Sequence, residues 1–217
     1  MDSSWPKGFF GFLRASFQDL QVATRIAMLT SIGEHGEYLT KYGGDGNPNF
    51  RSMQWHGLGN IGLLFPEFKL AETWFNTAVD GVKADMKAGV YADGVETEQT
   101  SSYHLVAASN FDSFAQTITL AHQPLDPDIN STLQNMYDYT AYSLDSSGYN
   151  PLNSDSDLEN MRSTVFDAAQ QFGRSDWLYI ISNGVNGTKP PGSGSRMFPW
   201  SGQFIMRSSW TGDNMQW

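Results

Sequence analysis

Helical periodicity is the feature that most constrains this chain. In nearly every segment up to about residue 182, apolar side chains recur at the three- and four-residue spacing of an amphipathic helix. Loops rich in glycine, proline and asparagine separate these segments. The sequence therefore predicts a mainly α fold. Helices are expected over residues 17–32, ending near Gly33, over 49–65, over 66–90 with Pro66 at the first position, from the Tyr103 segment to about His122, over 127–144 and 157–172, and in SDWLYIISNG.

The composition changes abruptly after residue 183. Residues 184–196 are rich in Gly, Pro and Ser and indicate a linker, whereas SGQFIMRSSW alternates as a strand does. We therefore predict one helical domain over residues 1–183, followed at 197–217 by the first strands of a truncated antiparallel β domain. Because an isolated strand pair is marginally stable and leaves apolar surface uncovered, we also expect self-association through this part.

Charge and composition exclude several classes of function. A formal net charge of −10 argues against a nucleic-acid partner or an anionic membrane surface. No run approaches the roughly 20 apolar residues that span a bilayer. The chain has no Cys, which excludes thiolate catalysis, and its four His are scattered without an HExxH spacing. No metal and no cofactor are expected.

The stretch DGVETEQTSSYHLVA, residues 93–107, combines an amphipathic pattern with unusual polar groups. Gln99, Tyr103, Val106 and Asn110 follow at i, i+4, i+7 and i+11, so they are predicted to share one helical face. An amide and a phenol on such a face, with an imidazole beside them, indicate more than core packing.

A second polar stripe lies on the helix predicted over residues 49–65, where Asn49, Met53, His56 and Asn60 have the same spacing. Buried polar groups need partners or must face a wet cleft, so two helices of this kind predict a groove between them. The alternative is structural: Asn49 caps its helix after Pro48, and His56 is a buried, hydrogen-bonded histidine.

Four motifs in this order resemble the heparinase II/III family of polysaccharide lyases. They are NFRSMQWHGLGNIGLLFPEF, Trp74, DGVETEQTSSYH and FPWSGQFIMRSSW, and together they cover roughly residues 49–210. Two positions depart from the family pattern, because Phe50 stands where Trp or His is usual and Thr100 where Ser is common.

The resemblance implies an incomplete (α/α) toroid of paired helices followed by an antiparallel β-sandwich domain. It also implies cleavage of a uronic-acid-containing polysaccharide, glycosaminoglycan- or alginate-like, by β-elimination. This reaction needs a group that neutralises the uronate carboxylate, a base for the C5 proton and an acid for the leaving oxygen.

Carried over by position, the resemblance makes Tyr103 the acid, and the base as well if both events occur on one face of the sugar. Asn49 becomes the carboxylate neutraliser, and His104 and Gln99 orient Tyr103 or contact the sugar. A structural alternative for His104 is a buried partner for a neighbouring helix. The remaining residues expected to contact the anionic polysaccharide are Arg51, Trp55, His56, Asn60 and Glu98.

Two other classes of function remain open from the sequence. A glycoside hydrolase on a similar helical toroid would need two carboxylates, and Asp93, Glu96 and Glu98 form the only dense acidic group. A non-catalytic carbohydrate-binding remnant is the other alternative. The family resemblance favours a secreted or periplasmic location, although MDSSWPKGFFGF lacks the pattern of a secretory signal.

Overall fold

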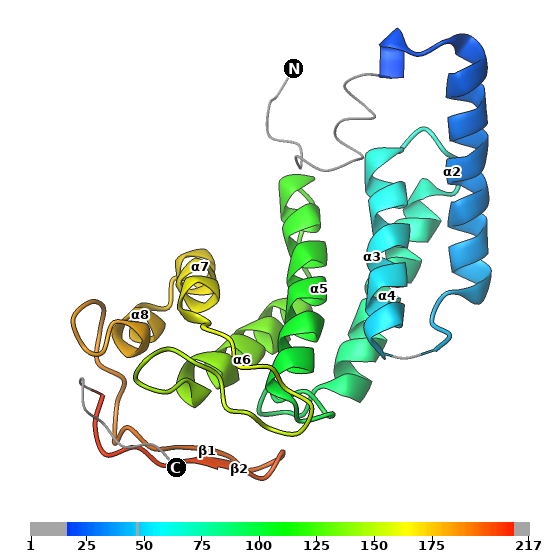
Figure 1. The fold of residues 1–217 in the computed structure, drawn as a ribbon. Coiled ribbons are helices and arrows are strands. Elements are labelled where there is room, and N and C mark those ends of the chain that lie inside the picture. Colours follow the sequence, from blue (N-terminus) through cyan, green and yellow to red (C-terminus); the bar gives the residue numbers. More distant parts are fainter. Residues whose placement is uncertain (1–16, 47, 211–217) are drawn as a thin grey trace. The chain divides into compact units, whose positions relative to one another are not determined.

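The structure is a computed structural model that describes residues 17–46 and 48–210 (Figure 1). Its elements are η1 (Phe17–Asp19), α2 (Val22–Tyr42), α3 (Pro48–Leu64), α4 (Ala71–Gly89), α5 (Ser101–Leu120), α6 (Pro127–Ser143), α7 (Arg162–Phe172), α8 (Ser175–Ile181), β1 (Arg196–Phe198) and β2 (Gln203–Ile205). The predicted fold class, mainly α with antiparallel strands at the end, is confirmed. None of the described helices has the length and apolar composition needed to cross a membrane.

The chain divides into two compact units. The first comprises Met1–Met86 and Ser109–Asn130, and the second comprises Lys87–Ala108 and Ser131–Trp217. Helix α5 contributes residues to both. Each unit has its own buried apolar residues, with Leu58, Val82 and Phe114 in the first and Leu133, Val165 and Trp177 in the second.

In the first unit, glycines allow helices to approach aromatic rings closely. A Cβ atom on Gly36 of α2 would lie 2.7 Å from the indole of Trp74, and one on Gly59 of α3 would lie 2.3 Å from Phe114. Such distances leave no room for a side chain. Glycine at these positions is therefore a packing requirement.

This packing explains why the predicted end of the first helix at Gly33 is wrong. Helix α2 continues through Gly33 and Gly36 to Tyr42, and Gly43 follows it. A Cβ atom on Gly33 would lie 3.2 Å from the ring of Phe68. A glycine within a helix marks either its end or a close contact, and only the tertiary structure distinguishes the two.

Three predicted helix starts are also wrong, and the first helix, α2, begins at Val22 rather than at residue 17. Helix α4 begins at Ala71 rather than Pro66, because residues 65–71 form successive turns in which the Phe68 and Ala71 amides donate to the Phe65 and Phe68 carbonyls. Helix α7 begins at Arg162 rather than near 157. The residues before it are held by Asn150, which bonds Glu159 through its backbone amide and through its side-chain oxygen.

The strands β1 and β2 pair antiparallel, with Arg196 opposite Ile205 and Phe198 opposite Gln203. Arg196, the last residue of the predicted linker, already belongs to β1. The expected alternation holds, because Phe204 and Met206 are exposed while Ile205 and Arg207 are buried. The exposed side of the hairpin is thus the more apolar one, and self-association through it stays a prediction.

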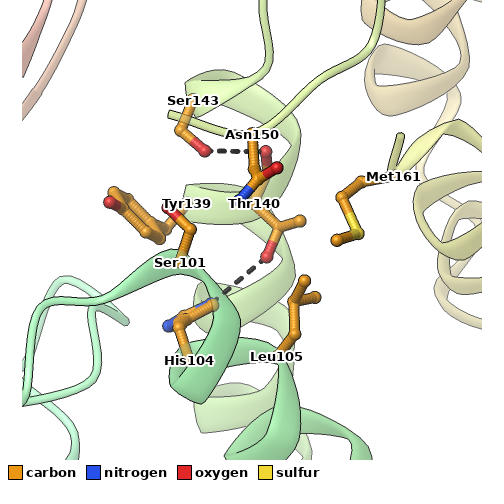
Figure 2. Close-up of a pocket in the computed structure, with 8 residues that line it drawn as sticks. All are labelled: Ser101, His104, Leu105, Tyr139, Thr140, Ser143, Asn150 and Met161. Carbon is orange, nitrogen blue, oxygen red and sulfur yellow. Dashed lines mark hydrogen bonds between the residues drawn. The ribbon is translucent and has the colours of Figure 1, made fainter. Parts of the chain in front are cut away.

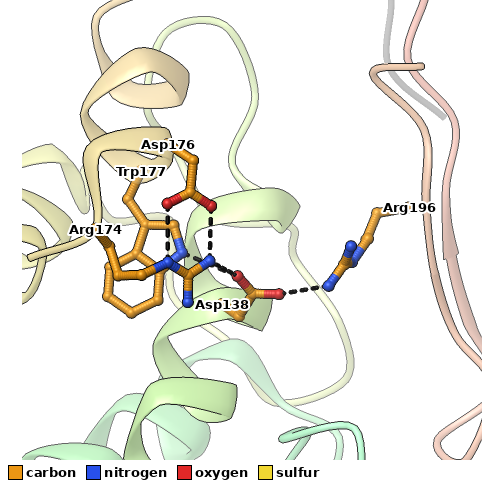
Figure 3. Close-up of polar contacts among 5 residues, drawn as sticks. All are labelled: Asp138, Arg174, Asp176, Trp177 and Arg196. Atoms are coloured by element: carbon orange, nitrogen blue, oxygen red, sulfur yellow. Dashed lines mark hydrogen bonds and ion pairs between the residues drawn. The ribbon is translucent and has the colours of Figure 1, made fainter. Parts of the chain in front are cut away.

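A buried carboxylate connects the hairpin to the helices of the second unit (Figure 3). Asp138 of α6 accepts hydrogen bonds from Arg174 at 2.6 Å, from Arg196 of β1 at 2.8 Å and from the indole of Trp177 at 2.9 Å. Arg174 also pairs with Asp176 and lies 4.2 Å from the centre of the Trp177 ring. One carboxylate therefore holds α6, α8 and β1 together.

We expect Asp138→Asn to destabilise the chain by about 2 kcal/mol, because Arg196 loses the charge it pairs with, while Arg174 retains Asp176. Denaturant unfolding measures the effect. Asp167→Asn is the matched control, since Asp167 is exposed on α7. Equal midpoints for the two variants would contradict this role of Asp138.

Candidate active site

The start of α5 fixes the backbone of Tyr103. Thr100 precedes the helix, and its hydroxyl accepts a hydrogen bond from the Tyr103 amide at 3.0 Å. The Ser101 amide donates to the hydroxyl of Ser156 at 2.9 Å. Thr100 is therefore the N-cap of α5, since a threonine hydroxyl can accept the hydrogen bond of a first-turn amide.

The side chain of Tyr103 is 38% exposed, and its hydroxyl has no hydrogen-bond partner among the described residues. A phenol that is fixed through its backbone but free at its oxygen is available to a ligand. This combination is what a general acid at a cleft requires.

The segment before α5 folds back on itself and onto α6. Val90 bridges Glu96, and the Tyr91 amide donates to the Val95 carbonyl at 2.8 Å. Gly94 has φ +90°, and a Cβ atom there would lie 2.2 Å from the backbone of Asn135. Both the conformation and the close approach to α6 require glycine at this position.

The predicted helical position of Gln99 is wrong. Gln99 has φ 56° and lies just before the N-cap, so it does not share a helical face with Tyr103. Its backbone is in the left-handed region because the chain turns sharply there, with the Gln99 amide donating to the Glu96 carbonyl. The side-chain oxygen of Gln99 accepts a hydrogen bond from Gln203 of β2 at 3.2 Å.

His104 lies inside the second unit with both ring nitrogens engaged. Nδ1 accepts from the Glu96 amide at 3.3 Å, so the ring proton is on Nε2, which donates to the Met136 carbonyl at 3.0 Å. Burial lowers the pKa of His104 to about 4, and the ring is neutral at pH 7. The imidazole thereby connects the segment before α5 to α6.

A small cavity adjoins this ring (Figure 2). Its volume is about 10 Å³, and it is lined by His104, Leu105, Met161 and the polar residues Ser101, Tyr139, Thr140, Ser143 and Asn150. A space of this size holds about one water molecule. It is too small for a sugar, so the inner side of His104 does not face a substrate cleft.

Glu96, whose backbone amide donates to the same ring, has a buried carboxyl group. Its oxygens accept from the Glu98 amide at 2.9 Å and from the Thr97 hydroxyl at 3.3 Å. Burial raises the pKa of Glu96 to about 7, although these hydrogen bonds favour the anion. Glu98 itself is exposed.

The three carboxylates of this segment have different surroundings. One oxygen of Asp93 accepts from the amides of Trp200 at 2.7 Å and Ser201 at 3.0 Å. The carboxylate of Asp93 is therefore used to hold the hairpin turn, and that of Glu96 is buried. This arrangement argues against a carboxylate pair for glycoside hydrolysis.

The polar stripe of α3 belongs to the first unit and partly finds partners there. Within the stripe, His56 lies 3.4 Å from the Thr117 hydroxyl. Beside it on α3, Ser52 accepts from the side-chain amide of Asn110 at 3.1 Å. Burial lowers the pKa of His56. The side-chain oxygen of Asn60 is buried with no hydrogen-bond partner among the described residues.

Arg51 and Trp55 are engaged with protein groups. Arg51 pairs with the buried carboxylate of Asp85 at 2.9 Å. Burial raises the pKa of Asp85, and the Arg51 charge opposes this shift. The indole of Trp55 packs against Gly44 and Gly81, where a Cβ atom would lie 2.6 and 2.4 Å from the ring. These contacts stabilise α3 against its neighbours.

The side chain of Asn49 lies outside the described residues. Helix α3 begins at Pro48, so Asn49 stands in its first turn and not at the cap. Pro at the first helical position, which has no amide hydrogen to satisfy, explains this start. The sequence alone had left the capping interpretation open.

Sequence reasoning missed the residues that hold this site together. Thr100 could have been found as a cap, since Thr before a helix is a favoured N-cap. Asp93 accepts hydrogen bonds from the turn after β1, and Gln99 accepts one from Gln203, so both join residues more than 100 positions apart. No local pattern indicates them.

Comparison with known proteins identifies the class. Residues 1–179 match the family model described as Heparinase II/III N-terminus. Because the match covers most of the chain, the chain belongs to this family, as the motifs at Asn49 and Tyr103 predicted.

Two curated relatives are heparin-sulfate lyases. The protein from Bacteroides thetaiotaomicron is 25% identical over 95% of this chain and 35% of its own length. That from Pedobacter heparinus is 28% identical over 84% of this chain and 28% of its own length. The chain thus spans about a third of the length of these relatives.

Solved structures share the fold. A heparinase III superposes with a TM-score of 0.76 at 24% identity, over 88% of this chain and 30% of that one. The heparan sulfate lyase HepC from Pedobacter heparinus gives 0.74 at 22% identity, over 89% and 31%. At such sequence identities the structural similarity shows a shared fold, and any argument about the reaction must come from the site residues of this chain.

We expect Glu96→Gln to remove the pH dependence of stability that the Glu96 carboxyl causes. The pKa of Glu96 is raised in the folded state from 4.5 to about 7, so its contribution is full below pH 4.5 and is lost as pH rises through 7. The amide stays neutral, so the variant should match the wild type near pH 5 and exceed it above pH 7.

Thermal unfolding at several pH values measures this difference, which should grow by up to about 1.4 kcal/mol per pH unit within that window. Glu72→Gln is the control, because Glu72 is exposed on α4. A pH-independent difference between Glu96→Gln and the wild type would contradict the raised pKa.

Proposed function

We propose that this chain is the helical part of a polysaccharide lyase that cleaves a glycosaminoglycan by β-elimination and leaves an unsaturated uronate. The family and the names of the relatives support the lyase class. The observation that carries the proposal is Tyr103, whose backbone is fixed by the Thr100 cap and whose hydroxyl is unpaired among the described residues.

In the proposed reaction, the proton on C5 of the uronate leaves to the base. The electron pair forms a C4–C5 double bond, and the C4–O bond breaks. The leaving oxygen takes a proton from Tyr103. If both steps occur on one face of the sugar, Tyr103 starts as the phenolate, takes the C5 proton and then gives it to the leaving oxygen.

We propose that Asn49 stabilises the charge that develops on the uronate carboxylate, through its amide group. The other predicted site residues divide between the second unit and the first. Gln99 and Glu98 stand beside Tyr103 in sequence and contact the sugar, whereas His104 positions the segment from inside. His56, Asn60, Arg51 and Trp55 are proposed substrate contacts of the first unit.

The same proposal extends to domains and location. We propose a helical domain over residues 1–183, a linker and the start of a β-sandwich domain, in a secreted or periplasmic protein. The substrate is an anionic polysaccharide, which a chain of net charge −10 repels at long range. Binding therefore depends on short-range contacts.

Tyr103→Phe should lower turnover by about 10²- to 10⁴-fold, because it removes only the proton-transferring hydroxyl. The assay follows the ultraviolet absorbance of the conjugated uronate on heparan sulfate, heparin and alginate. The melting temperature should be unchanged. Tyr149→Phe is the control, because Tyr149 is 37% exposed in the same unit, against 38% for Tyr103.

Full elimination activity in Tyr103→Phe would show that Tyr103 is not the general acid of the reaction. Reducing ends that appear without the absorbance would favour hydrolysis over elimination. A lower melting temperature with normal turnover would instead assign the Tyr103 hydroxyl a role in stability.

Asn49→Ala should lower turnover by roughly 10²- to 10³-fold, as the loss of one preorganised donor does. Because Asn49 is not the helix cap, the variant should keep the wild-type melting temperature. The neighbouring Phe50→Ala is the control, since Phe50 is exposed. Equal turnover in Asn49→Ala and the wild type would remove Asn49 from the mechanism.

A further inference from the structure

The turn that joins β1 to β2 presents an indole to solvent. Trp200 is 71% exposed. Tryptophan is highly buried on average, so a Trp this exposed is an informative exception. Its exposure leaves the large flat face of the indole ring uncovered.

The backbone under Trp200 is held rigidly. The carboxylate of Asp93 accepts from the Trp200 amide at 2.7 Å, from the Ser201 amide at 3.0 Å and from the Ser201 hydroxyl at 3.3 Å. The Ser201 hydroxyl also lies 3.1 Å from the Phe198 carbonyl. An aromatic ring on a fixed turn loses little entropy on binding, because few of its torsions remain free.

The same turn is tied to the Tyr103 segment. Gln203 donates to Gln99 at 3.2 Å, four residues before Tyr103, and both residues belong to the second unit. Gln203 lies three residues after Trp200, and a chain reaches at most about 3.5 Å per residue, so their Cα atoms are within roughly 11 Å. Trp200 and Tyr103 are therefore linked through one hydrogen-bonded pair, Gln203 and Gln99.

Charge favours stacking over ion pairing at this place. Of the hairpin cations, Arg196 pairs with Asp138, and Arg207 is buried and donates to the Tyr142 and Leu144 carbonyls. A pyranose ring has a C–H face that packs on an aromatic plane without any charge. Such contacts are typical of ligand sites lined by aromatic residues.

We propose that Trp200 is a substrate-binding platform on which a pyranose ring of the polysaccharide stacks, next to the sugar that Tyr103 acts on. The inference rests on the proposed function and adds a binding residue outside the chemical step. Trp200 contributes to affinity and to the placement of the polymer, and takes no part in proton transfer.

The test compares Trp200→Ala and Trp200→Phe with the wild type on heparan sulfate oligosaccharides. Trp200→Ala should raise KM, and the Kd measured by calorimetry in a Tyr103→Phe background, roughly tenfold, with kcat changed less than about twofold. Trp200→Phe should restore most of the affinity. The Kd of Trp200→Ala divided by that of the wild type should stay the same at about 0.5 M salt, since salt screens charge interactions and does not weaken stacking.

Met197→Ala is the matched control, because Met197 is 59% exposed on the same hairpin and should leave KM and Kd unchanged. Melting temperatures of all variants should agree. A lower melting temperature together with a lower kcat in Trp200→Ala would make Trp200 a structural residue and overturn the proposal.

Two failures are distinguishable. If the wild type binds and cleaves the polysaccharide, and Trp200→Ala does so with the same KM and Kd, then Trp200 does not bind the substrate. The proposed function would be unaffected by this result. If the wild type neither binds nor cleaves any of the polymers, the proposed function fails, and the platform fails with it.

Discussion

The hydrogen bonds of the His104 ring are the interaction on which the candidate site depends. The imidazole accepts from the Glu96 backbone and donates to that of Met136, so one buried side chain holds the segment before α5 against α6. An unpaired buried amide or carbonyl would cost about 1–3 kcal/mol. Holding the ring neutral is the condition for both bonds, and burial provides it.

Ring contacts connect the buried His104 to the β-hairpin. The ring of His104 packs edge-on against Tyr139 at 5.0 Å, and Tyr139 packs in the same way against Phe198 of β1 at 5.1 Å. Asp93 and Gln99 add polar links to the hairpin turn and to β2. The hairpin is thus fastened to the segment that carries Tyr103 by one aromatic and two polar connections. A pair of short strands that is marginal alone gains its stability in this way.

The surroundings of the acidic residues separate structural from functional roles. Asp138 and Asp93 both accept several hydrogen bonds, and each holds distant parts of the second unit together. Glu96 is buried with a raised pKa, whereas Glu98 is exposed beside Gln99. Carboxylates that look alike in the sequence DGVETE therefore have three different surroundings, which only the tertiary structure reveals.

The sequence by itself determined the mainly α class, most helix centres, the strand alternation at residues 204–207 and the family, because periodicity and short motifs are local properties. It also indicated Tyr103, since the motif around it is contiguous. The tertiary structure decided what depends on distant neighbours: Gly33 and Gly36 lie inside a helix against aromatic rings, Gln99 lies outside α5, and His104 faces the interior. Each of these outcomes depends on a contact with a segment that is distant in the sequence, and local sequence patterns do not indicate such contacts.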